Sequence, residues 1–228
     1  MVKRLTSTAQ NISSTYYPQY LEDLLACNYA ACEATIKQLL TLEVDLKEIY
    51  TGFFQRSLYD VGRLWEQNKI TVSKEHVATA LTETLITLLY PALFTRPRAG
   101  RKAMIACGAE GTHRIGAKIV ADYFELLGWD CEFLNEPLTF KHLAEKDDAD
   151  FPDLLAHSLS LSFQIPLLEQ ELHLIKTHFP QLPMIVGGQA FAKIDDSAWQ
   201  KKNGVTIVRN LDALETYLLQ YECRKVGE

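Results

Sequence analysis

Apolar residues recur every three to four positions through the first half of the chain, from about Pro18 to Phe94. Four stretches carry this period: residues 18–27, 29–43, 45–67 and 73–94. The period is typical of amphipathic helices. Ser73, which directly precedes a Lys-Glu pair, is the predicted N-cap of the fourth helix. Because the connections are short, the stretches predict an antiparallel four-helix bundle over residues 15–95.

The pattern changes after a short basic segment, residues 95–101, in which Pro97 and Gly100 interrupt any helix. We interpret this segment as a linker. Beyond it, apolar runs predict strands at residues 102–108, 130–136, 153–162, 183–188 and 205–210, and amphipathic stretches predict helices at 113–129, 138–146, 166–179 and 211–225. Alternating strands and helices predict a doubly wound, five-stranded parallel sheet with flanking helices. The predicted fold class is therefore α + α/β, with a helical bundle followed by a Rossmann-like domain over residues 102–228.

Composition narrows the class of protein. The 228 residues carry a net charge of −6, which argues against a protein that coats nucleic acid. No apolar run is long enough to span a bilayer, and the N-terminus lacks the apolar core of a secretory signal. Five scattered cysteines without metal or redox spacing favour free thiols in a reducing cytoplasm. We therefore expect a cytoplasmic protein.

A histidine follows the first predicted strand, at the sheet edge where ligands of open parallel sheets bind. This residue is His113, in the loop 108–116, and Gly116 lies one turn later and leaves room for close approach. A histidine that caps the helix or lies exposed is the alternative interpretation. No other His, Cys or carboxylate lies at zinc-like spacing from it. A metal carried inside an organic cofactor therefore fits an axial imidazole better than a metal held by protein alone.

Two further features fall at the same edge. Ser158, Ser160 and Ser162 alternate with leucine, so one face of the third predicted strand should carry three hydroxyls. Central parallel strands are usually wholly apolar, and buried hydroxyls need partners. Either a polar group inserts between sheet and helix, or the strand lies near an edge with one face in water. Gly187 and Gly188 follow the fourth strand, where paired glycines make a tight turn or let a ligand lie against the backbone.

His113, Gly116, the strand of alternating serine and leucine and the Gly187–Gly188 pair together resemble the cobalamin-binding domain family. The resemblance implies that His113 replaces dimethylbenzimidazole as the lower ligand of cobalt. It also implies that the displaced nucleotide tail runs past the serines to the glycine pair. Two positions depart from the family pattern: Gly111 stands where the family has an acidic residue, and no serine has leucine two places on.

In the helical half, nine residues separate Trp65 from the pair Glu75-His76. This spacing resembles the CarH-type cobalamin-dependent photoreceptors, in which a helical bundle caps the upper face of the corrin. The resemblance implies that Trp65 lies beside the 5′-deoxyadenosyl group and that Glu75 and His76 contact or support it. In that family a histidine follows the tryptophan and captures cobalt after illumination, whereas Glu66 stands here and His76 is the nearest candidate. A tryptophan in the bundle core and an ordinary helix start are the alternative interpretations.

These resemblances imply a cobalamin-binding light sensor that is not an enzyme. Photolysis of adenosylcobalamin would repack the cap and change self-association or the binding of a regulatory protein partner in trans. The sequence shows no DNA-binding winged helix ahead of the bundle, and it does not settle whether a bilin also binds. The alternatives are a corrinoid carrier of a methyltransferase system and a cobalamin storage or delivery protein. The residues implied to bind the cofactor are Trp65, Glu75, His76, Thr112, Gly116, Ser158, Ser160, Ser162, Gly187 and Gly188, with His113 as the axial ligand of cobalt.

Overall fold

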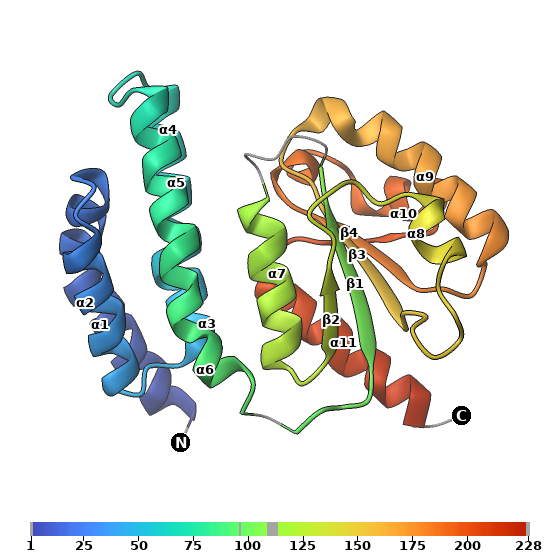
Figure 1. The fold of residues 1–228 in the computed structure, drawn as a ribbon, viewed down its shortest axis with the longest axis horizontal. Helices are drawn as coiled ribbons and strands as arrows, with labels where there is room; N and C mark the ends of the chain where they lie inside the picture. Colours follow the sequence, from blue (N-terminus) through green and yellow to red (C-terminus); the bar gives the residue numbers. More distant parts are fainter. Residues whose placement is uncertain (1, 96, 109–113, 227–228) are drawn as a thin grey trace. The chain divides into compact units, whose positions relative to one another are not determined.

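The computed structural model divides into two compact units, Met1–Thr95 and Arg96–Glu228 (Figure 1). It describes the backbone of residues 2–95, 97–108 and 114–226, and the side chains of 13–95, 97–108 and 114–223. None of the helices in these ranges combines the length and the hydropathy that crossing a bilayer requires.

The N-terminal unit is helical, as the apolar period predicts. Its elements are α1 (Val2–Leu25), α2 (Tyr29–Thr41), α3 (Leu46–Ile49), the π-helical turn η1 (Tyr50–Gln55), α4 (Arg56–Glu66), α5 (Val72–Ile86), the 3-10 turn η2 (Thr87–Leu89) and α6 (Tyr90–Leu93). The segments from α3 to α4 and from α5 to α6 run on without a loop, so the described residues of this unit form four helical rods (Figure 1).

Aromatic side chains form much of the core of this unit. The rings of Tyr20 and Phe53 meet edge to face with centroids 5.6 Å apart, and Tyr17 packs against both. The hydroxyl of Tyr17 donates to Oδ2 of Asp60 at 2.6 Å, and the Arg56 guanidinium lies 3.8 Å from the Tyr17 ring centroid. Burial and the Asp60 hydrogen bond raise the pKa of Tyr17. These contacts fix α1 to α4, the helix that carries Trp65.

Two helix starts differ from the sequence prediction. Helix α5 begins at Val72, and its N-cap is Thr71, whose hydroxyl accepts from the backbone N–H of Lys74 at 3.3 Å. The prediction of Ser73 as the cap is therefore wrong, because an equally good capping residue two positions upstream already adopts the extended conformation. Helix α1 also continues upstream of Pro18, although proline contributes no N–H to the helical hydrogen bonds.

The C-terminal unit is a five-stranded parallel sheet in the order β2-β1-β3-β4-β5, which confirms the predicted fold class. The strands are β1 (Lys102–Cys107), β2 (Asp130–Phe133), β3 (Leu154–Ser158), β4 (Met184–Gly187) and β5 (Thr206–Val208). The helices are α7 (Ile115–Leu126), α8 (Phe140–Ala144), α9 (Ile165–His178), α10 (Asp196–Asn203) and α11 (Leu211–Val226). Strand order reverses between β1 and β3, which is where open sheets of this type bind ligands.

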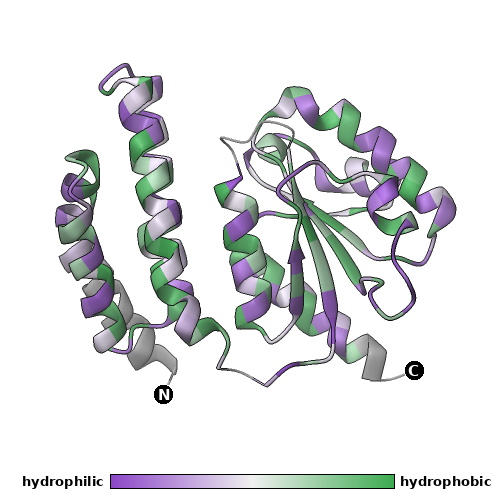
Figure 2. Ribbon diagram, viewed as in Figure 1, coloured by the Kyte–Doolittle hydropathy of each residue, from purple (hydrophilic) through white to green (hydrophobic). Residues whose placement is uncertain are grey.

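Helices cover both faces of the sheet, so the central strands are hydrophobic along most of their length (Figure 2). Met104, Leu155 and Val186 belong to a buried cluster that includes side chains of α9. Side chains alternate between the two faces along a strand, so a residue an odd number of positions from Leu155 on β3 points to the opposite face. Ser158 therefore lies on the face away from this cluster.

The third strand is shorter than predicted. It ends at Ser158, because its neighbours end there too: Cys107 and Gly187 are the last residues that pair with it. Ser160 lies in the loop beyond, and Ser162 begins a 3-10 turn that leads into α9. The prediction that one strand face carries three hydroxyls is therefore wrong, since Ser158 alone of the three belongs to the strand.

Helix α10 has no counterpart among the predicted elements. The segment is short and mostly polar, so it lacks the apolar period of a longer amphipathic helix. Trp199 is its buried side chain, and it packs edge to face on Phe191 with centroids 5.1 Å apart. The side chain of Asp195 caps the helix by accepting from the N–H of Ala198 at 2.7 Å. The cap, the buried Trp199 and polar contacts to other elements, such as the pairing of Lys202 with Glu169, thus stabilise this helix.

Candidate functional site

The strand ends form one row at the carboxyl edge of the sheet. Ser158 pairs with Cys107 on one side and with Gly187 on the other, and Gly187 pairs in turn with Val208. Ser158 thus stands at the centre of the edge, next to the point where strand order reverses. The fold brings the predicted serine and glycine features together from segments about 30 residues apart in the chain, as expected for parallel strands joined by crossover helices.

Helix α7 approaches this serine through a glycine. A β-carbon placed on Gly116 would lie 3.5 Å from Oγ of Ser158. That distance is ordinary van der Waals contact, so a methyl group fits and any longer side chain would occupy the space in front of the hydroxyl. Helix α7 and strand β3 therefore approach each other closely at this point, with the Ser158 hydroxyl between them.

The two glycines after β4 are each required by close backbone contacts. A β-carbon on Gly187 would lie 2.6 Å from the carbonyl oxygen of Val208. Gly188 has φ +96°, and a β-carbon there would lie 2.4 Å from the carbonyl oxygen of Leu159. The turn interpretation of this pair is therefore correct. The carbonyl groups of Val208 and Leu159 occupy the positions where side chains would lie, so the glycines let the backbone pack closely beside Ser158.

His113, Thr112 and the departure at Gly111 lie outside the described residues. The description stops at Gly108, which follows β1, and resumes at Arg114, directly before α7. In the described ranges, no group of three or more His, Cys, Asp or Glu side chains converges as a metal site would.

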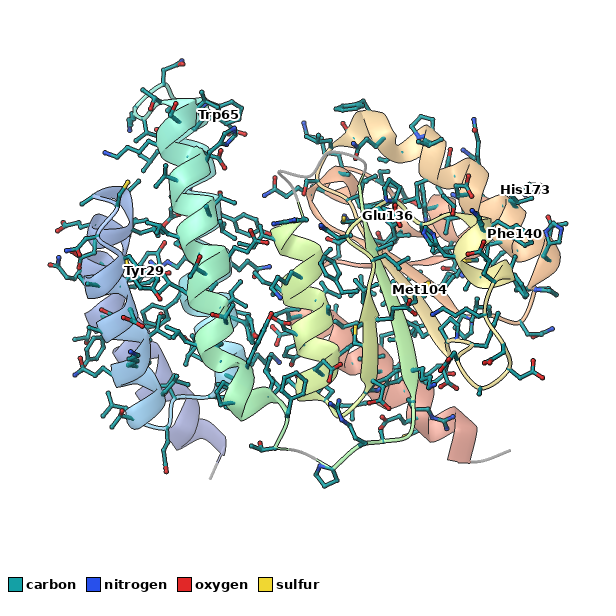
Figure 3. The ribbon with its side chains drawn as sticks, viewed as in Figure 1. Tyr29, Trp65, Met104, Glu136, Phe140 and His173 are labelled. Carbon is teal, nitrogen blue, oxygen red and sulfur yellow. The ribbon has the colours of Figure 1, made fainter. Side chains whose placement is uncertain are left out.

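In the helical unit, Trp65 lies near the end of α4 with 46% of its surface exposed (Figure 3). The core interpretation of this tryptophan is therefore wrong. Glu75 and His76 lie in the first turns of α5, where Oε2 of Glu75 is 2.5 Å from Nδ1 of His76. Thr79 donates to the other carboxylate oxygen at 3.0 Å. The Glu75 carboxylate, which has a partner at each oxygen, thus orients the imidazole of His76, and the His76 side chain is 55% exposed.

Sequence reasoning missed Thr79, although its position four residues after Glu75 is the spacing of neighbours on a helix face. It also missed His157, which precedes Ser158 on β3 and is 5% exposed. Its Nδ1 finds no partner within the described part of the chain. Burial lowers the pKa of His157 to about 4, so the imidazole is neutral near pH 7.

Burial makes the thiols of Cys107 and Cys131, the two cysteines on strands of the sheet, unreactive. Burial raises the pKa of the Cys107 thiol, whose sulfur lies 3.7 Å from the carbonyl oxygen of Leu134. Burial likewise raises the pKa of Cys131 on the edge strand β2. Both groups therefore remain protonated thiols near pH 7, which is the unreactive form.

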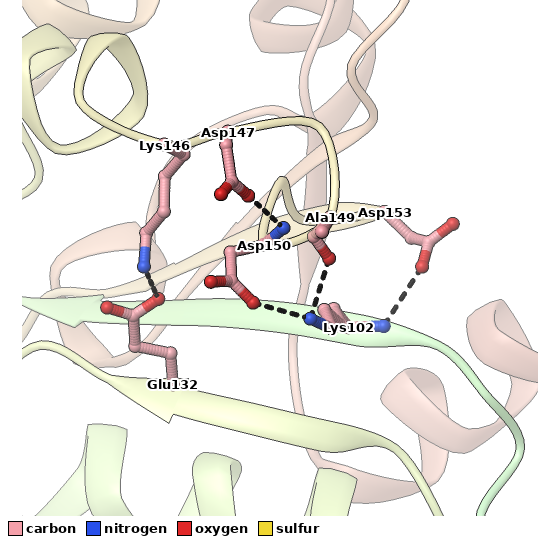
Figure 4. Close-up of polar contacts among 7 residues, drawn as sticks. All are labelled: Lys102, Glu132, Lys146, Asp147, Ala149, Asp150 and Asp153. Carbon is pink, nitrogen blue, oxygen red and sulfur yellow. Dashed lines mark hydrogen bonds and ion pairs between the residues drawn. The ribbon is translucent and has the colours of Figure 1, made fainter.

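The opposite, amino edge of the sheet is held by ion pairs (Figure 4). Nζ of Lys102 contacts Asp150 at 2.8 Å and the carbonyl oxygen of Ala149 at 2.7 Å. Lys146 pairs with Glu132 at 2.6 Å. These contacts fasten the loop before β3 to β1 and β2. Since both ammonium groups already have carboxylate partners, they stabilise the fold at this edge and are not placed to bind an anionic ligand.

Comparison with known proteins places the chain beside proteins that bind corrinoids or carry a B12-binding domain model. Residues 17–90 match the family model described as "B12 binding domain". Over 135 residues the chain is 30% identical to the HTH-type transcriptional repressor CarH of Myxococcus xanthus; the match covers 58% of this chain and 44% of that protein, so the chain spans less than half of its relative. The fold is similar to that of the monomethylamine corrinoid protein of Methanosarcina barkeri, with a TM-score of 0.72 and 18% identity over 92% of this chain and 99% of the other.

Proposed function

We propose that the chain is a cobalamin-binding light sensor, because residues 17–90 match the B12 binding domain model and the chain is 30% identical to CarH over 135 residues. The cofactor would be adenosylcobalamin, bound with His113 as the lower axial ligand. The observation that carries the proposal is Trp65, a large aromatic side chain that stays 46% exposed at the end of a bundle helix. Exposed tryptophans of this kind commonly serve recognition rather than packing.

The residues of the sheet edge fit a long polar tail. The space between Gly116 and the Ser158 hydroxyl is one that a longer side chain at position 116 would fill. Gly187 and Gly188 extend the same edge with bare backbone. Ser158 would donate a hydrogen bond to the tail or accept one from it. Ser160 and Ser162 would contact the tail from the residues beyond the strand.

The helical unit would supply the residues above the corrin. Bound adenosylcobalamin supplies a cobalt–carbon bond that visible light breaks. Trp65 would cover the adenosyl group and exclude water, while Glu75 holds His76 in one orientation through Nδ1. Residues 15–95 would thus form a cap over a cofactor held by residues 102–228. Loss of the covered group would leave Trp65 without its contact, so the cap would repack and alter self-association or the binding of a protein partner.

A corrinoid carrier of a methyltransferase system is the second candidate. It is favoured by the fold likeness to the monomethylamine corrinoid protein, which extends over 99% of that chain. A carrier presents its upper face to partner enzymes, so it gains nothing from a preference for the bulky adenosyl group. Preference between adenosyl and methyl forms therefore separates the two candidates.

The test is an absorption spectrum of the full chain mixed in darkness with adenosylcobalamin, repeated after green light, with size-exclusion chromatography of both samples. A sensor shows a bound dark spectrum that light converts, together with a change in assembly size. Binding without more light response than the free cofactor contradicts the sensor and favours the carrier. Methylcobalamin, measured in parallel, gives the preference for the upper group.

A further inference from the structure

A carboxylate lies at the carboxyl edge beside the proposed site. Glu136 follows β2, and its carbonyl oxygen accepts from the N–H of Cys107 at 3.4 Å. The same segment is paired one step earlier, where Leu134 donates to the carbonyl oxygen of Ile105 at 2.7 Å. Since Cys107 also pairs with Ser158, Glu136 stands two strands from the central serine, in the same row of strand ends (Figure 3).

A histidine on the next helix holds this carboxylate in place. Nδ1 of His142 accepts from the backbone N–H of Thr139 at 3.1 Å, so its proton is on Nε2. Nε2 lies 3.1 Å from Oε1 of Glu136 and donates to it. The Glu136 side chain is nevertheless 65% exposed. One oxygen is therefore fixed and the group as a whole faces outward.

The charge of this carboxylate is not balanced by its partner. Glu132, four residues earlier, pairs with the ammonium group of Lys146 at 2.6 Å. Glu136 is held instead by an imidazole that, in this tautomer, carries no charge. At the ligand edge the protein thus presents a fixed anionic acceptor. Such a group attracts neutral N–H donors and repels anions.

We propose that Glu136 distinguishes corrinoids by the side chains at the rim of the corrin ring. It would accept a hydrogen bond from a carboxamide there and repel a carboxylate at the same position. This inference rests on the proposed function, because it takes a corrinoid as the ligand. The rim of cobalamin carries acetamide and propionamide side chains, each of which offers N–H donors. A corrinoid with one of these amides hydrolysed would place a second negative charge against Glu136.

The experiment compares the binding of hydroxocobalamin with that of its three propionamide-derived monocarboxylic acids, by equilibrium dialysis of the full chain in darkness at neutral pH. The unsubstituted protein should bind one of the three acids about tenfold more weakly than hydroxocobalamin, because like charges face each other. Glu136→Gln should bring that ratio close to one. The variant keeps the fold, since the side chain is mostly exposed.

Glu145→Gln is the matched control, because it removes the same charge from an exposed residue just beyond α8. It should leave the tenfold ratio in place. Equal binding of all four corrinoids by the unsubstituted protein, or a ratio that persists in Glu136→Gln, would overturn the inference while the proposed function stands. Binding of none of the four would overturn the proposed function, and this inference with it.

Discussion

Oγ of Ser158 lies 3.5 Å from the position that a β-carbon on Gly116 would take, so helix α7 and the central strand β3 approach each other closely at this hydroxyl. The two residues are 42 positions apart in the chain and come together through the parallel pairing of β1 with β3. We propose that the cofactor tail lies beside this contact, so a larger side chain at position 116 should interfere with it.

Gly116→Leu should block cofactor binding without unfolding the protein. The larger side chain would fill the space in front of Ser158, so affinity for hydroxocobalamin should fall by at least about tenfold, the equivalent of ~1.4 kcal/mol. Gly116→Ala is the control, because a methyl group fits at 3.5 Å and alanine favours helix by ~0.5–1 kcal/mol. Titration by absorbance and thermal unfolding of both variants measure the two effects. Full affinity in Gly116→Leu would place the tail elsewhere.

Gly188→Ala should destabilise the C-terminal unit by about 2–4 kcal/mol. The residue has φ +96°, and the added β-carbon would meet the Leu159 carbonyl oxygen at 2.4 Å. Gly62→Ala provides the comparison, since a β-carbon there has nothing within 4 Å and the residue lies inside α4. Urea denaturation should show a clear loss for the first variant and none for the second. Equal urea midpoints for the two variants would mean that the turn accommodates the added β-carbon without loss of unfolding free energy.

Stability should fall in acid because of His157. Its pKa is about 4 in the folded chain and about 6.5 when unfolded, so the unfolded state binds the proton more readily. The contribution is complete above pH 6.5 and is lost as the pH falls from there toward 4, by ~3 kcal/mol in total. His157→Phe should flatten this part of the profile of unfolding free energy against pH. His173→Gln, at an exposed site on α9, should leave the profile as it is.

Trp65→Ala should reduce the preference for adenosylcobalamin over methylcobalamin and leave the stability of the protein nearly unchanged. The side chain is 46% exposed, so its loss should cost less than about 1 kcal/mol of unfolding free energy. Tyr59→Ala removes another 46% exposed aromatic from the same helix and should keep the preference. The two affinities, measured in darkness, give the ratio. An unchanged ratio in Trp65→Ala would remove this residue from the upper face.

His113→Ala should replace imidazole below the cobalt with water. The absorption spectrum of bound cobalamin should then shift to that of the form lacking a nitrogen base, with weaker binding. Adding free imidazole should restore the spectrum. His178→Ala, at an exposed position on α9, is the control and should leave the spectrum unaltered. A spectrum insensitive to the loss of His113 would exclude this residue as the axial ligand.

The apolar period predicted the long elements well, since an amphipathic helix or a buried strand must repeat its pattern to reach the core. The residues at which these elements begin and end were harder to predict. Ser158 ends β3 because β1 and β4 end beside it, which is a property of the neighbours and not of the segment itself. Likewise Thr71 and Ser73 are both good caps by residue type, and the extended backbone of Thr71 in the folded chain makes it the cap.

The sequence predicts His113, Gly116, Ser158 and the glycine pair as site residues, because each lies toward the end of a predicted strand or in the segment just beyond it. Glu136 and Thr79 were missed, since what singles them out is a hydrogen bond to another residue. Glu136 gains its place from the pairing of its backbone with Cys107 and from the imidazole of His142. No pattern of polar and apolar positions encodes such a contact.

The sequence by itself thus determined the helical unit, the parallel sheet and the resemblance to cobalamin-binding proteins, because periodicity and motif spacing are local properties. Only the tertiary structure decided that Trp65 is exposed, that Ser158 faces Gly116 and that Ser160 and Ser162 leave the strand. Burial and close approach depend on what lies across from a residue. Those partners come from distant segments that the fold alone brings together.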